Sequence, residues 1–78
     1  MDTTLLNRIT TNPKILVGKP IIRGMRMSVE HVLKMLARGI SYEEIFIDYP
    51  FLEEDDIKAC LLYAAVQIST GIEIEIEA

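Results

Sequence analysis

The stretch that decides the fold runs from residue 41 to residue 70 and reads SYEEIFIDYPFLEEDDIKACLLYAAVQIST. Ser41, followed three residues later by a glutamate, has the capping-box pattern that starts a helix. Pro50 ends this helix near Asp48, because proline lacks an amide hydrogen and restricts the residue before it. The acids at 53–56 then favour the positive end of a second, longer helix. A short helix, a tight turn and a longer helix predict a helix-turn-helix unit.

Another helix precedes this unit. Between Ser28 and Arg38 the apolar residues follow the i, i+3, i+4, i+7 spacing of an amphipathic helix. Ser28 is a suitable N-cap, and Gly39 is a suitable residue to end the helix. We expect this helix to supply one side of the core through Val32, Leu33 and Leu36. The longest helix should supply the other side through the stripe Ile57, Leu61, Ala65 and Ile68.

The N-terminal segment 7–27 has a different pattern. Turn-forming residues at Pro13, Gly18-Lys19-Pro20 and Gly24 separate short apolar or β-branched runs. This pattern predicts a small β element, with candidate strands at Arg8 to Thr10, Lys14 to Val17 and Met25 to Met27. Because Pro20 has no amide hydrogen and Gly24 tolerates positive φ, we expect the segment between them to loop out and expose Lys19 and Arg23.

The C-terminal segment 72–77 alternates isoleucine with glutamate, which is the period of a strand with one apolar face. The apolar face consists of Ile72, Ile74 and Ile76. A lone strand leaves its backbone groups unpaired, so we expect these isoleucines to form a dimer or partner interface. The alternative is a disordered or purely intrachain tail. The predicted fold is mainly α: a three-helix bundle over 28–69, a β and turn segment over 7–27, and a strand or tail over 72–77.

Length and composition limit the class of protein. The chain has 78 residues, of which 50% are hydrophobic, so we expect a single small domain over 1–78. Such a domain has a thin core, which favours a homodimer or a partner chain. A single cysteine and no paired Cys/His spacing argue against a disulfide scaffold and a zinc module. The absence of a signal-peptide pattern or a long apolar run predicts a cytoplasmic protein without membrane contact.

Charge is distributed unevenly along the chain. Residues 1–40 carry seven Lys and Arg against two acids, a formal charge of +5, whereas residues 41–78 carry one Lys against ten acids, a charge of −9. The basic half is suited to phosphate contact, and scattered surface charge is the alternative interpretation. Acids at the start of the longest helix oppose its entry into a DNA groove. The predicted DNA-binding residues are therefore Lys19, Arg23, Arg26, Lys34 and Arg38.

Catalytic chemistry is not indicated. His31, the only histidine, has no motif around it and is interpreted as a partly exposed surface residue. Cys60 is interpreted as a buried thiol, and the acids at 53–56 as a helix cap with a solvated face. The sequence shows no nucleophile–base pair, metal-ligand cluster or phosphate-binding loop. We therefore expect a protein that is not an enzyme and that uses no metal or cofactor.

Three short motifs occur in order along the chain: Gly18-Lys19-Pro20, Gly24-Met25-Arg26 and Asp48-Tyr49-Pro50. Through them, and over about residues 9–65, the sequence resembles the domain-of-unknown-function four-three-three family. Two positions depart from the family pattern: Met25, where members usually have Thr, and Glu53, where they usually have Thr or Ser. The resemblance implies a homeodomain-like three-helix bundle with a small β element. It also implies an antitoxin-like role beside a PIN-like nuclease toxin.

Two functional hypotheses follow. The first is a small dimeric helix-turn-helix protein that binds operator DNA and neutralises a cognate PIN-like toxin. The tail would serve this role, because its glutamates complement the cations around a nuclease active site. The alternative is a protein-interaction module without DNA binding, which the net charge of −4 and the acidic start of the longest helix favour.

Overall fold

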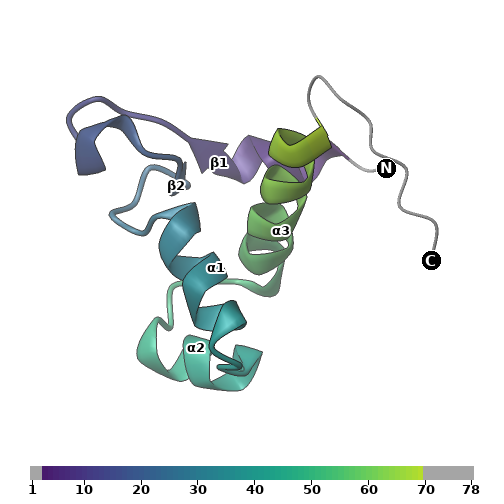
Figure 1. Cartoon of the computed structure of the whole chain (residues 1–78). Helices are drawn as coiled ribbons and strands as arrows, with labels where there is room; N and C mark the ends of the chain where they lie inside the picture. Colours follow the sequence, from purple (N-terminus) through teal and green to yellow (C-terminus); the bar gives the residue numbers. More distant parts are fainter. Residues whose placement is uncertain (1–2, 70–78) are drawn as a thin grey trace.

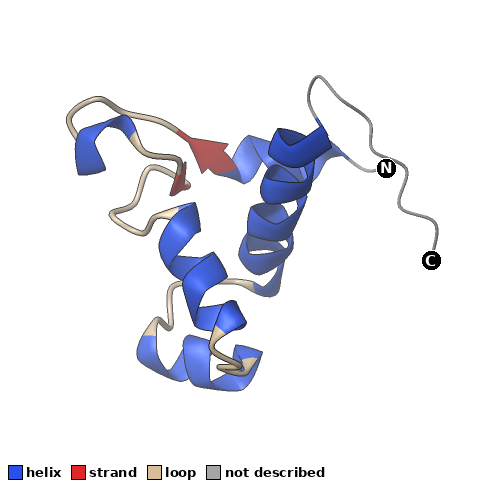
Figure 2. Cartoon of the chain, viewed as in Figure 1, coloured by secondary structure: helices blue, strands red, loops and turns tan. Residues whose placement is uncertain are grey.

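The computed structural model describes residues 3–69, and the predicted strand 72–77 with Ile72, Ile74 and Ile76 lies outside them. The chain is mainly helical with a small two-stranded sheet near its N-terminus (Figures 1 and 2). Its elements are the 3-10 helix η1 (Thr3–Arg8), strand β1 (Ile9–Thr10), the 3-10 helix η2 (Leu16–Gly18), strand β2 (Ile21–Ile22), and helices α1 (Val29–Ala37), α2 (Tyr42–Asp48) and α3 (Glu54–Ser69). Figure 1 shows α2 at one end of the molecule and the sheet at the other, with α1 between them.

The helix boundaries follow the predicted capping signals. The Ser28 hydroxyl accepts a hydrogen bond from the His31 amide at 3.0 Å, and the Ser41 hydroxyl accepts one from the Glu44 amide at 3.2 Å. At the other end of α1, Gly39 adopts a φ of +81°. Its amide and that of Ile40 bond back to the last turn of α1, which is the Schellman arrangement that glycine permits. The three predicted helices are confirmed.

The β element differs from the prediction. Strand β1 pairs antiparallel with β2, with Ile9 opposite Ile22 and Thr10 opposite Ile21. The expected strands at 14–17 and 25–27 are wrong, since η2 occupies part of the first and the pairing strand is Ile21–Ile22. The expected loop between Pro20 and Gly24 is wrong, since Ile21 and Ile22 are completely buried, but the expected exposure of Lys19 and Arg23 is confirmed. Burying this apolar pair outweighs the turn signals that flank it.

A tight turn follows β2 and places Arg23. The Met25 amide bonds to the Ile22 carbonyl at 2.8 Å, so Arg23 and Gly24 are the two central residues of the turn. Both have positive φ, +46° and +71°, as in the turns that match the twist of a hairpin. The Arg23 amide also donates to the Arg8 carbonyl at 2.7 Å. The backbone around Arg23 is thus fixed to the end of η1.

The core draws on strand β2 and on all three helices. Its buried members are Ile22, Met27, Val29, Val32, Met35, Ile45, Leu52, Ile57 and Cys60. The buried position expected for Cys60 is confirmed, and burial, followed by the nearby Asp56 charge, raises the pKa of its thiol to about 12. No helix within residues 3–69 is long and apolar enough to cross a membrane.

The expected inward stripe of α3 is wrong beyond Ile57. Leu61 is 44% exposed and Ile68 is 81% exposed, whereas Ala59 and Cys60 are completely buried. Helix α3 packs on η1 as well as on α1, so its buried surface is wider than a single stripe. Apolar residues surround this helix from Ala59 to Val66, and the periodicity therefore does not distinguish the inward face.

The corrected face can be tested with two truncations on α3. We expect Ile57→Ala to lower the free energy of unfolding by about 2–5 kcal/mol, because it leaves a cavity in the core. Leu61→Ala removes a half-exposed side chain and should cost less than about 1.5 kcal/mol. Urea denaturation of both variants measures the difference. Equal losses would show that the two faces of α3 are assigned incorrectly.

Candidate functional site

The predicted DNA contact Arg23 is bound to a buried carboxylate. Its Nε donates to Asp56 Oδ1 at 3.0 Å, and its Nη2 donates to Asp56 Oδ2 at 2.8 Å. The same Nη2 donates to the Phe51 carbonyl at 2.8 Å. Asp56 is completely buried, whereas the Arg23 side chain is 36% exposed. This bidentate pair matches the planar guanidinium to the carboxylate, and it engages Nε and Nη2 of Arg23 inside the protein.

A second arginine, Arg8, completes this group. Its Nη1 donates to Asp56 Oδ1 at 3.0 Å and to Glu53 Oε1 at 2.6 Å. The Glu53 amide donates to Asp56 Oδ2 at 2.8 Å, so the carboxylate also caps the start of α3. We call Arg8, Arg23, Glu53 and Asp56 the Asp56 cluster. It connects η1, the turn after β2 and the first turn of α3.

The electrostatics of the Asp56 cluster favour the charged carboxylate. Burial raises the pKa of Asp56, but the hydrogen bonds from Arg23, the Glu53 amide and Arg8 lower it more, and the pKa lies below its ordinary value. Asp56 is therefore ionised at neutral pH. The expectation that residues 53–56 form a solvated face holds for Glu53, Glu54 and Asp55, which are exposed, and is wrong for Asp56. Sequence reasoning did not single out Arg8 or the burial of Asp56.

Two other predicted DNA contacts share one acid. Lys19 Nζ lies 3.1 Å from Glu30 Oε1, and Lys34 Nζ lies 2.9 Å from Glu30 Oε2. The hydrogen bonds from Lys34 and then Lys19 lower the pKa of Glu30. All three side chains are at least half exposed, so these pairs are weak and can exchange with solvent.

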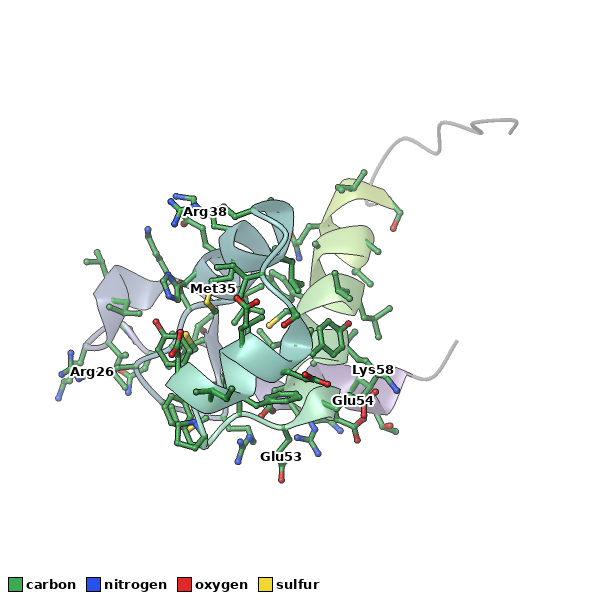
Figure 3. The ribbon with its side chains drawn as sticks, turned by 90° about the horizontal axis from the view of Figure 1, so that it is seen from below. Arg26, Met35, Arg38, Glu53, Glu54 and Lys58 are labelled. Atoms are coloured by element: carbon green, nitrogen blue, oxygen red, sulfur yellow. The ribbon has the colours of Figure 1, made fainter. Side chains whose placement is uncertain are left out.

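The last two predicted contacts, Arg26 and Arg38, make no ion pair within residues 3–69. Both are exposed. Figure 3 shows them on different parts of the surface and away from Glu53 and Glu54. The five predicted contacts therefore do not gather into one basic patch.

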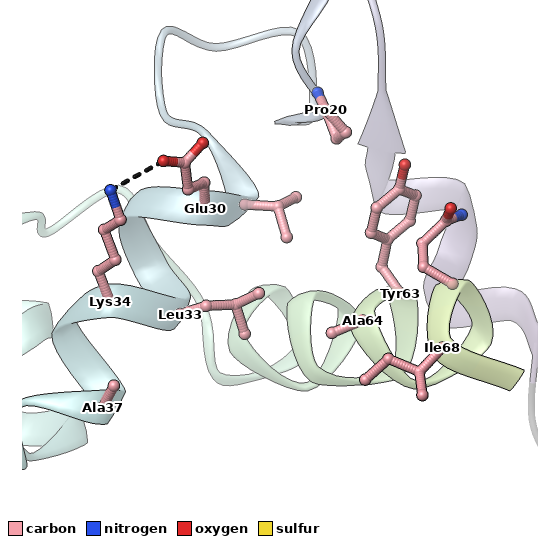
Figure 4. A pocket seen from close by; sticks show the side chains of 10 residues that line it. Pro20, Glu30, Leu33, Lys34, Ala37, Tyr63, Ala64 and Ile68 are labelled. Atoms are coloured by element: carbon pink, nitrogen blue, oxygen red, sulfur yellow. Dashed lines mark ion pairs between the residues drawn. The ribbon is translucent and has the colours of Figure 1, made fainter. Parts of the chain in front are cut away.

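An apolar groove lies between α1 and α3. It has a volume of about 540 Å³ and is visible in Figure 4, where Leu33 and Ala37 of α1 face Ala64 and Ile68 of α3. Pro20 lies above its far end, and the Glu30–Lys34 pair lies along its edge. The complete lining is Pro20, Val29, Glu30, Leu33, Lys34, Ala37, Tyr63, Ala64, Gln67 and Ile68.

A second, smaller pocket has a more polar lining. Its volume is about 330 Å³, and Leu16, Arg26, Met27, Ser28, His31 and Tyr49 line it. His31 is exposed, as expected, and its Nε2 lies 3.1 Å from the Tyr49 hydroxyl. The two rings meet edge to face at a centroid distance of 5.8 Å. Among the described residues, no three His, Cys, Asp or Glu side chains converge as metal ligands would.

Comparison with known proteins identifies the family. Residues 9–64 match the family described as protein of unknown function (DUF433), and the chain belongs to this family. The match begins one residue after Arg8 and includes Arg23, Glu53 and Asp56.

One relative is the Uncharacterized protein y4eO of Sinorhizobium fredii (strain NBRC 101917 / NGR234), which is 36% identical over 56 residues. That alignment covers 72% of this chain and 25% of the relative, so the chain spans about a quarter of the relative's length. No solved structure matches the chain significantly.

The Asp56 cluster predicts a specific loss of stability. We expect Asp56→Asn to lower the free energy of unfolding at pH 7 by about 3 kcal/mol, because both arginines lose their buried counter-charge. Asp55→Asn is the matched control, since Asp55 is exposed and lies 3.8 Å from Arg8. It should cost less than about 1 kcal/mol. Equal stability of the two variants in urea titrations would contradict this role of Asp56.

The same cluster predicts an acid dependence. The folded-state pKa of Asp56 lies below its ordinary value of 3.8, so its stabilisation is complete above that pH. It is lost as the pH falls through the lower folded-state pKa. We therefore expect the stability difference between the parent and Asp56→Asn to shrink below about pH 4. Urea titrations between pH 2 and pH 7 measure this, and a difference that persists unchanged at pH 2 would contradict it.

Proposed function

We propose that this protein is an antitoxin-like module that holds a PIN-like nuclease toxin by direct protein contact. The apolar groove between α1 and α3 carries the proposal. Leu33, Ala37 and Ile68 line a cavity of about 540 Å³ that opens to solvent. Because exposed apolar surface costs free energy in water, a groove of this kind favours a partner that covers it. The partner class comes from the family resemblance.

The shape of the groove favours a helical partner. An amphipathic helix binds by laying its apolar face into a groove between two helices, with anchors spaced at i, i+3, i+4 and i+7. The walls contributed by α1 and α3 lie opposite each other in Figure 4. The Glu30, Lys19 and Lys34 group at the edge offers both signs of charge to the rim of such a contact. Polar rims of this kind determine partner choice more than affinity.

Self-association belongs to the same proposal. Ile68 is 81% exposed and lines the apolar groove, so it adds to a contiguous apolar surface that a second copy could cover. Ile72, Ile74 and Ile76, which lie outside the described residues, are proposed from their alternation in the sequence to contact a second copy or the toxin. The glutamates at 73, 75 and 77 suit a basic nuclease surface and oppose DNA contact.

Operator binding is the second candidate function. The order α2, turn, α3 favours a homeodomain-like helix-turn-helix arrangement, and the exposed cations Arg26 and Arg38 favour phosphate contact. The acids in the first turn of α3 oppose the usual docking of this helix in the major groove, because they would face the DNA. The nearest cations, Arg8 and Arg23, are bound to Asp56. DNA contact is therefore proposed to involve the surface of Arg26 and Arg38.

The groove can be blocked without disturbing the core. We expect Ala37→Arg, at an exposed groove position on α1, to weaken toxin binding at least tenfold because the larger side chain fills the groove. Ala65→Arg is the matched control: it makes the same change at an exposed alanine of α3 that does not line the groove. Calorimetric titration with a purified PIN-like nuclease as the candidate toxin measures both affinities. Parental affinity in Ala37→Arg, or no binding by the parent, would contradict the proposal.

If the protein binds operator DNA, the arginines should differ in their effect on DNA affinity. Arg26→Ala and Arg38→Ala should each flatten the slope of log affinity against log salt by about 0.9, the value of one lost phosphate contact. Arg23→Ala should instead lower the melting temperature and leave the slope unchanged, because Arg23 serves Asp56. Anisotropy titrations of operator-length duplex at several salt concentrations measure the slopes. A slope changed by Arg23→Ala but not by Arg26→Ala would contradict this division.

A further inference from the structure

We propose that the pocket lined by Arg26, Ser28, His31 and Tyr49 binds a phosphate group. This pocket shares no lining residue with the apolar groove. Its lining contains a cation and several hydrogen-bond donors but no acid. A fully charged arginine, an imidazole and two hydroxyl groups around one cavity are suited to an oxyanion. The inference goes beyond toxin binding and does not depend on it.

Arg26 supplies the charge. Of the four arginines in the chain, Arg8 and Arg23 are bound to Asp56, whereas Arg26 makes no ion pair with any described residue. Glu30, the acid nearest to it in sequence, is paired with Lys19 and Lys34 and does not line the pocket. The guanidinium therefore has its donors available. Its planar fork fits two oxygens of a phosphate group at once.

His31 and Tyr49 supply an oriented donor. The 3.1 Å contact joins His31 Nε2 to the Tyr49 hydroxyl. When Nε2–H donates to the tyrosine oxygen, the tyrosine O–H is released to donate to an anion in the pocket. The Tyr49 ring also meets Phe51 edge to face at a centroid distance of 6.1 Å, and the Tyr49 amide donates to the Ile45 carbonyl at 2.8 Å. The hydroxyl is thus positioned before any ligand arrives.

The remaining lining strengthens these contacts. Buried Met27 and partly exposed Leu16 also line the pocket, so part of its wall is apolar. Charge-assisted hydrogen bonds are stronger beside such walls than in open water. The pocket also joins two of the sequence motifs, Gly24-Met25-Arg26 and Asp48-Tyr49-Pro50, which lie far apart in the chain. Neither the Asp56 cluster nor the groove accounts for Arg26 or for the Tyr49 hydroxyl.

Nuclear magnetic resonance on the full chain tests the site. Inorganic phosphate is titrated while the ring signals of His31 and Tyr49 are followed, in the parent and in Arg26→Gln, Tyr49→Phe and Lys14→Gln. We expect saturable shifts in the parent and in Lys14→Gln, which removes one positive charge from an exposed position outside the pocket. Binding should weaken at least tenfold in Arg26→Gln and in Tyr49→Phe. Thermal melts confirm that all four proteins are folded.

A second titration with a short DNA duplex distinguishes the source of the phosphate. Shifts at His31 and Tyr49 with the duplex alone assign the pocket to a backbone phosphodiester, whereas shifts with inorganic phosphate assign it to a free phosphate group. Either result supports the proposal if Arg26→Gln and Tyr49→Phe lose it. The proposal is overturned by shifts that never saturate with either probe, or by equal losses in Arg26→Gln and Lys14→Gln.

Discussion

A carboxylate removed from water must keep its hydrogen bonds and a counter-charge, and Asp56 obtains both only where three segments meet. Arg8 comes from the end of η1, Arg23 from the turn after β2, and the Glu53 amide from the start of α3. The positive φ of Arg23 directs its side chain to this point. The positions of the sheet, of α3 and of the N-terminal segment therefore all depend on bonds to the same buried carboxylate.

The uneven charge of the sequence is largely neutralised within the fold. Cations of the basic half pair with acids at the start of α3, and Lys19 and Lys34 pair with Glu30. A formal charge of +5 over residues 1–40 is therefore not a basic surface. Among residues 3–69, Lys14, Arg26 and Arg38 are exposed cations without an ion pair, and the apolar groove is open to solvent. This balance supports the proposed role in protein contact.

Local sequence signals predicted that the helices form. They did not predict how the helices pack against segments far away in the chain. Ser28, Ser41 and Gly39 act within one turn of the backbone, so their patterns predicted the ends of α1 and the start of α2. The inward face of α3 depends on Asp56, whose partners lie 33 and 48 residues away in the chain. Without knowledge of those partners, the local sequence predicts that the acidic run is solvated. It also predicts that Arg23 is a free surface cation, because its pairing with Asp56 is not visible locally. The His31–Tyr49 contact was likewise beyond local patterns, since α2 must first turn back towards α1.

The separation of Arg8 from Asp56 has a consequence for synthesis on the ribosome. The counter-charge Asp56 emerges 48 residues after Arg8 and 33 residues after Arg23. Until then, η1 and β2 have no α3 to pack against, and the nascent chain cannot close its core. We therefore expect the core to close only after α3 has left the exit tunnel, because the Arg8–Asp56 pair closes a long loop. A chain stalled before residue 56 would expose Ile21 and Ile22 to chaperones and proteases.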